Sequence, residues 1–88
     1  MALRELLDIA RDQVAEVTGR RVESISGFHR DGDGAWIVTV DVLELERVPS
    51  TLDLMASYAV TLSDDGELLG MERVRRYHRS AVDDGNRG

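Results

Sequence analysis

Ala35–Glu46 (AWIVTVDVLELE) is the stretch of sequence that decides the fold. Trp36, Val38, Val40 and Val42 occupy alternate positions along it, so their side chains share one face of a strand. The alternation shifts near Val42-Leu43, which predicts a β-bulge or a strand end at that point. The pattern therefore predicts a strand with one face turned toward a core.

Extended segments lie on both sides of this strand. Three further strands are expected: Arg21–Arg30, Leu52–Leu62 and Leu68–Arg79. Residues 31–34 (DGDG) and 63–67 (SDDGE) separate them, and Gly and Asp accept the positive φ angles that tight reversals need. The second of these is expected to be a type I turn followed by a Gly bulge. The chain therefore contains two hairpin signals.

Residues 2–18 have the pattern of an amphipathic helix. The apolar side chains recur at steps of three and four, which places them on one stripe: Leu3, Leu6, Leu7, Ala10, Val14 and Val17. Gly19 is expected to end the helix, because Gly tolerates the left-handed conformation there. Acidic residues line the opposite side: Glu5, Asp8, Asp12 and Glu16. A solvated face is the simpler interpretation, and an electrostatic docking face is the alternative.

The order of these elements predicts an α+β fold, with one N-terminal helix packed on an antiparallel sheet of three or four strands. Leu6, Ala10 and Val14 are expected to contact the apolar face of the sheet. Residues 1–80 should form a single domain and residues 81–88 a flexible C-terminal tail. The helix-then-meander order resembles PepSY-like and cystatin-like small domains, which is an analogy of fold alone.

Composition narrows the functional classes. The chain has 88 residues, no Cys and a formal net charge of −6. Without Cys there is no disulfide and no thiolate metal site. The negative charge opposes general binding of nucleic acid. The charged N-terminus lacks the apolar region of a signal peptide, and no apolar run reaches the ~20 residues that span a bilayer. We therefore expect a cytoplasmic protein without nucleic-acid or membrane partners.

No catalytic or metal-binding pattern is complete. The DGDG turn begins like a calcium loop, but Ala35 takes the third ligand position and Val42 the position of the bidentate acid. His29 and His78 are the only histidines, and no HExxH spacing occurs. No GxSxG motif is present, and no Gly-rich phosphate loop precedes a helix. We expect no metal, no cofactor and no enzymatic activity.

The last strand carries the residues most suggestive of a binding site. With the turn at 63–67, Leu62 should pair with Leu68 and Val60 with Gly70. The uncovered sheet face would then expose apolar side chains among arginines, a composition typical of protein interfaces. The expected protein-binding residues are Met55, Leu69, Met71, Arg73, Arg75, Arg76 and Tyr77. Two alternatives remain for the basic run: an edge strand protected by charge, and a nucleic-acid surface.

The sequence also resembles the gas vesicle protein O family, especially its actinobacterial members. Three segments carry the resemblance: VTGRRVESISG (17–27), the W-x-V-x-V-[DE]-V-x-E-x-x-R-x-P pattern of residues 36–49, and LMASYAVTLSDDGELLGMERVRRYHR (54–79). It implies a role in building gas vesicles, the gas-filled protein shells that give cells buoyancy, and it supplies no catalytic residues. Many members carry a polar N-terminal extension that this chain does not show, which leaves open that it belongs to a longer protein.

Three functions are therefore weighed. The first is an accessory protein of gas vesicle assembly that binds shell or accessory proteins, located in the cytoplasm or on the vesicle, with a homodimer through the open sheet face as a further option. The second is a regulatory or nucleic-acid-binding module that uses the C-terminal arginines. The third is a PepSY-like inhibitory or ligand-binding domain.

Overall fold

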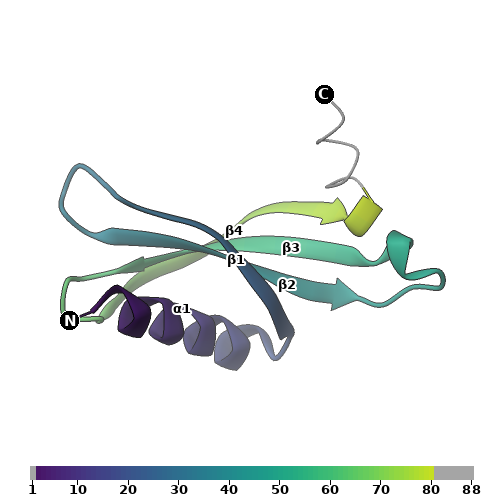
Figure 1. Ribbon diagram of the computed structural model, residues 1–88, viewed down its shortest axis with the longest axis horizontal. Helices are drawn as coiled ribbons and strands as arrows, with labels where there is room; N and C mark the ends of the chain where they lie inside the picture. The colour runs from purple at the N-terminus through teal and green to yellow at the C-terminus, as the bar shows by residue number, and fades with distance from the viewer. Residues whose placement is uncertain (1, 81–88) are drawn as a thin grey trace.

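The computed structural model describes residues 2–80. One helix precedes four strands: α1 (Leu3–Thr18), β1 (Arg21–Arg30), β2 (Trp36–Leu45), β3 (Leu54–Leu62) and β4 (Leu68–His78), with a short 3-10 helix, η1 (Ser50–Leu52), between β2 and β3. The strands form one antiparallel sheet in the order β1-β2-β3-β4, and α1 lies across one face of it (Figure 1). The expected α+β architecture is confirmed, with four strands.

The ends of α1 follow from the local sequence. At its start, the backbone N–H of Ala2 donates to the Glu5 carboxylate at 3.1 Å. At its end, Gly19 adopts φ 66° and its N–H donates to the carbonyl of Ala15. A glycine in this left-handed conformation ends a helix without the steric penalty that a Cβ would bring. The helix therefore begins one residue after the start of the expected pattern and ends before Gly19, as expected.

The core lies between α1 and one face of the sheet, which we call the helix face. Leu6, Ala10 and Val14 of α1 are buried against residues of β2 and β3, and the fully buried members from the two strands are Val38, Val40, Val42, Ala56, Val60 and Leu62. Each buried Val or Leu side chain contributes roughly 1.5–3 kcal/mol relative to an exposed one. The packing expected from the sequence is confirmed, although Tyr58 is half-buried at the margin of the core.

The β1–β2 and β3–β4 hairpins, at one end of the sheet, are closed by turns of the same type. The N–H of Gly34 donates to the carbonyl of Asp31 at 3.1 Å, and the N–H of Gly66 donates to the carbonyl of Ser63 at 2.9 Å. The two glycines have φ angles of 88° and 85°. This geometry is a type I turn followed by a Gly bulge, as expected for residues 63–67.

The opposite end of the sheet is formed by the connection between β2 and β3. It contains a cis peptide bond between Val48 and Pro49 and then η1, so β3 begins at Leu54, two residues later than expected. The β2–β3 ladder skips Glu44, because Leu43 pairs with Met55 and Leu45 with Leu54. The irregularity expected near Val42-Leu43 is thus located one residue further along.

The register of β4 differs from the expectation. Leu62 pairs with Leu68 as expected, but Val60 pairs with Met71 and not with Gly70, because Leu69 is an extra residue in β4. This bulge reverses the facing of the residues that follow it. A second extra residue, Val74, restores the original facing. The two bulges decide which side chains of β4 lie on each face of the sheet.

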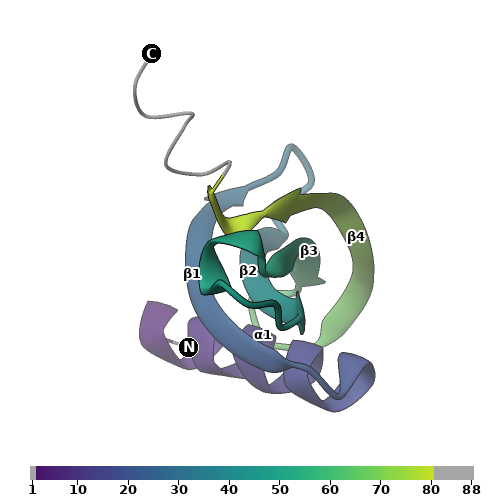
Figure 2. The ribbon, with the colours of Figure 1, turned by 90° about the vertical axis from the view of Figure 1, so that its right-hand side faces the viewer.

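The sheet is strongly curled. Figure 2, which looks along the molecule, shows β1 and β4 arching to either side of β2 and β3. The face opposite α1, which we call the open face, carries Ile37, Thr39, Asp41 and Leu43 from β2. The tail expected at residues 81–88 lies outside the described residues.

Candidate functional site

The arginines of β4 are divided between the two faces of the sheet. Arg73 pairs with Tyr58 and Arg76 with Ala56, whose positions lie on the helix face. Arg75 pairs with Ser57 and Tyr77 with Met55, on the open face. Arg75 and Tyr77 thus lie on the open face as expected, but the expected facing of Met71 and Arg73 is wrong, because the bulges at Leu69 and Val74 turn these two residues to the helix face.

Glu44 holds the helix-face group. Its carboxylate lies 2.7 Å from Nε of Arg76 and 3.6 Å from an Nη of Arg73. A guanidinium nitrogen of Arg20 also donates to the main-chain carbonyl of Glu44. Only 11% of the Glu44 side chain is exposed, while Arg73 and Arg76 are about half exposed, so one sheltered residue contacts three cations, two through its carboxylate and one through its carbonyl.

Arg75 and Tyr77 form the open-face group. The guanidinium carbon of Arg75 lies 4.2 Å from the centre of the Tyr77 ring, a distance at which a cation is attracted to the aromatic face. Within residues 2–80, Arg75 makes no ion pair. Its charge therefore lies over an aromatic ring and is not neutralised by any carboxylate within residues 2–80.

Arg79 closes one end of the open face. Its guanidinium lies 3.1 Å from the Glu23 carboxylate of β1 and 3.2 Å from the Asp53 carboxylate that precedes β3. The main-chain N–H of Arg79 also donates to the main-chain carbonyl of Asp53 at 2.8 Å. Partial burial alone would lower the pKa of Arg79, but the hydrogen bonds to Glu23 and Asp53 raise that pKa above its ordinary value. The first and last strands are thus linked across the curl of the sheet.

The expected apolar patch does not form. Met55 is on the open face but only 4% exposed, and Met71 packs against the core on the helix face. Leu69, at the bulge, is 58% exposed and lies toward the opposite end of β4 from Tyr77, the partner of Met55. The sheet curls around the open face (Figure 2), and Met55 and Ser57 of β3 are buried on that face. Its polar residues there are satisfied, since the hydroxyls of Ser24 and Ser57 both donate to the Asp41 carboxylate.

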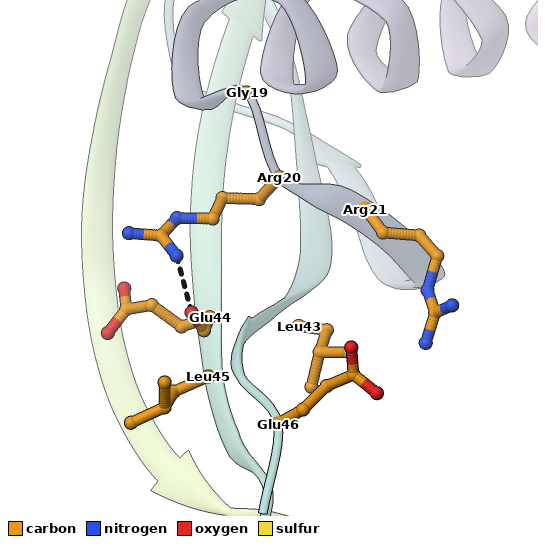
Figure 3. A pocket seen from close by; sticks show the side chains of 7 residues that line it. All are labelled: Gly19, Arg20, Arg21, Leu43, Glu44, Leu45 and Glu46. Atoms are coloured by element: carbon orange, nitrogen blue, oxygen red, sulfur yellow. Dashed lines mark hydrogen bonds between the residues drawn. The ribbon is translucent and has the colours of Figure 1, made fainter.

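A notch lies between the end of α1 and the end of β2 (Figure 3). It is a hollow of about 420 Å³ lined by Gly19, Arg20, Arg21, Leu43, Glu44, Leu45 and Glu46. Arg20, Glu44 and Leu45 lie on one side of the β2 backbone, while Arg21 and Leu43 lie on the other. The notch exists because the β1–β2 ladder ends at the Arg21–Leu43 pair and β2 continues beyond it.

The remaining candidates from the sequence lie apart from these groups. The Asp31 carboxylate accepts the N–H groups of Asp33 and Ala35, so in this turn it stabilises the hairpin. His29 pairs with Ile37 near the hairpin turns, whereas His78 pairs with Leu54 at the other end of the sheet. No cluster of three His, Cys, Asp or Glu suited to a metal ion occurs within residues 2–80.

Sequence reasoning missed the acidic partners of the arginines. Glu44, Glu23 and Asp53 come from three different strands or connections, and their spacing along the chain carries no signal of their convergence. Arg20 was likewise not anticipated at the notch. Only Glu44 had a local signal, since the alternation of apolar residues shifts next to it.

Over residues 2–80, the one long helix is too short and too charged to cross a membrane.

Comparison with known proteins places the chain in one family. Residues 1–83 match the family model described as gas vesicle synthesis protein GvpO. Gas vesicle protein O of Streptomyces sp. (strain CB03234) is 55% identical over 71 residues, which cover 81% of this chain and 55% of the relative. Gas vesicle protein O1 of Halobacterium salinarum is 30% identical over 70 residues, covering 80% of this chain and 58% of the relative.

A third relative, gas vesicle protein O of Haloferax mediterranei, is also 30% identical over 70 residues, which cover 80% of this chain and 50% of the relative. The chain therefore spans about half the length of the curated relatives it matches. No solved structure matches it.

Proposed function

The chain belongs to the gas vesicle synthesis protein GvpO family, and from that premise we propose that it assists gas vesicle assembly by binding other gas vesicle proteins, shell or accessory, and not by catalysis. Family membership supports the connection with gas vesicles. The further step, to binding through protein contacts, is supported by the exposed cations of β4.

The observation that carries this step is the state of Arg75. It is exposed, it stacks on Tyr77, and within residues 2–80 no carboxylate neutralises it. Stacking reduces the conformational freedom that a long side chain loses on binding, and arginine and tyrosine are enriched at the energetic centres of protein interfaces. A charge held in this way suits an acidic group on another protein.

The first test is charge reversal at this position in cells. Arg75→Glu should change the free energy of unfolding by less than about 1 kcal/mol, because the side chain is exposed and makes no ion pair. In a gas-vesicle-forming host that lacks its own copy of the gene, we expect the variant to give few or no vesicles by electron microscopy, while the unaltered chain restores them.

Arg11→Glu supplies the matched control. Arg11 is exposed on α1, makes no ion pair within residues 2–80, and the substitution changes the charge by the same amount. It should leave vesicle formation unchanged. A folded Arg75→Glu protein that restores normal vesicles would contradict the proposed docking role, and equal losses in both variants would show an effect of net charge alone.

A further inference from the structure

Three arginines surround Glu44 at the edge of the notch beside α1, and of the three only Arg20 lines the notch itself. Arg20, Arg73 and Arg76 converge on Glu44, the first on its carbonyl and the other two on its carboxylate. The Glu44 carboxylate balances one of these three charges, and the other carboxylate that lines the notch, that of Glu46, lies on the other side of the β2 backbone from Arg20 (Figure 3). Each guanidinium has five N–H donors in a fixed fork, so donors remain after the bonds to Glu44 are made. Because Arg73 and Arg76 are 48% and 49% exposed, these donors can be reached from solvent.

The end of β2 and the connection after it expose apolar side chains, of which Leu45 lines the notch with Arg20. Leu45 is 47% exposed and lies on the same side of β2 as Arg20 and Glu44 (Figure 3). Val48, in the connection that follows, is 97% exposed. Arginine is enriched at protein interfaces, and an exposed apolar side chain beside it gives a partner apolar surface to bury. A nucleic acid would need many phosphate contacts, and the net charge of −6 opposes them.

We propose that the arginines around Glu44 and the adjoining notch bind an acidic segment of a partner protein, with carboxylates of the segment pairing with Arg20, Arg73 and Arg76 and an adjoining apolar side chain packing on Leu45. In the free protein, the Glu44 carboxylate is paired with Arg73 and Arg76, so it competes with carboxylates of the partner for these two arginines. The proposal rests on the proposed function, because it names the chemistry that the gas vesicle partner presents to this part of the chain.

Substitutions of Arg20 and Glu44 should change the affinity for an acidic ligand in opposite directions. Arg20→Gln removes one of the three cations around Glu44. An acidic ligand should therefore bind about fivefold to tenfold more weakly, as expected for the loss of one charge-assisted contact. Glu44→Gln removes the internal competitor, so the same ligand should bind roughly threefold or more tightly. A general loss of structure would weaken binding in both variants, and therefore cannot imitate this result.

The probe is a short synthetic peptide of alternating Glu and Leu residues, titrated into the ¹⁵N-labelled 88-residue chain. Amide signals of Arg20, Glu44 and Leu45 should shift and saturate, and a peptide with Gln in place of Glu should cause no saturating shift. Arg4→Gln is the control, because Arg4 is exposed at the start of α1, roughly 24 Å along the helix from Arg20. It should leave the dissociation constant unchanged.

Several outcomes would overturn the proposal. These are saturating shifts only at Arg75 and Tyr77, tighter binding of a single-stranded oligonucleotide than of the acidic peptide at the same residues, or weaker binding in both the Arg20 and Glu44 variants. Vesicle formation tests the proposed function separately. If Arg75→Glu abolishes vesicles while the peptide leaves the notch unshifted, the docking function stands and the assignment of the notch fails.

Discussion

Three carboxylates form ion pairs with arginines in and just after the C-terminal strand. Glu23 and Asp53 hold Arg79, and Glu44 holds Arg73 and Arg76. Ion pairs this exposed contribute little individually, usually less than about 1 kcal/mol. Asp53 differs, because it is only 5% exposed and accepts hydrogen bonds from Arg79 and from the N–H of Arg47. Arg79 therefore has a structural role, and Arg75 does not.

This difference predicts unequal effects of two alanine substitutions on β4 and its end. Arg79→Ala leaves the sheltered Asp53 carboxylate with one fewer donor and should lower the free energy of unfolding by about 1–2 kcal/mol. Arg75→Ala should lower it by less than about 1 kcal/mol, since only the stacking on Tyr77 is lost. Urea denaturation followed by circular dichroism measures both, and equal losses would contradict the assignment of roles.

At the scale of the elements, the turn between β1 and β2 tests directly whether a position with a positive φ requires glycine. Gly34 has a φ of 88°, while Gly32 in the same turn has no positive φ, and a Cβ on either would meet no atom within 4 Å. Gly34→Ala should therefore destabilise the protein by about 1–2 kcal/mol through backbone conformation alone. Gly32→Ala should be neutral within about 0.5 kcal/mol. Thermal melting compares the two, and an equal effect would show that the turn tolerates the strain.

The helix, the turns and the buried face of the sheet could be predicted from the sequence because each has a local signature. Apolar spacing and Gly19 define α1, and the glycines of the two hairpins define where the chain reverses. The register of β4 could not be predicted, because the extra residues Leu69 and Val74 have no compositional signal. One misplaced residue was enough to assign Met71 and Arg73 to the wrong face.

The candidate site was less predictable than the fold. That β4 is basic was evident from the sequence, but the ion pairs of its arginines depend on side chains from other strands. Met55 is buried on the open face of a strongly curled sheet (Figure 2), and single-sequence periodicity does not report such a curl. The sequence therefore predicted a charged strand. It did not predict which of its arginines pair with carboxylates of the same chain.

At the scale of the whole molecule, one helix covers one face of a curled sheet, and the two edge strands take different roles. β1 is linked to the end of β4 through Glu23 and Arg79, while β4 presents Arg75, Tyr77 and the outer parts of Arg73 and Arg76 to solvent. Both edge strands contain register shifts, which interrupt a ladder and discourage uncontrolled pairing with other sheets. Recognition through side chains of β4 is the mode of binding that this arrangement favours.

Site-specific photo-crosslinking in cells that form gas vesicles tests this central claim most directly. A benzophenone amino acid replaces Val74, which is 50% exposed between Arg73 and Arg75, or Phe28, which is 45% exposed on β1 at the opposite edge of the sheet. Both positions tolerate a bulky apolar side chain, because both already expose one to solvent. The account predicts a crosslinked product from position 74 that mass spectrometry identifies as containing another gas vesicle protein, with little or none from position 28. Equal products from both positions, or none from position 74 in cells whose vesicles form normally, would contradict it.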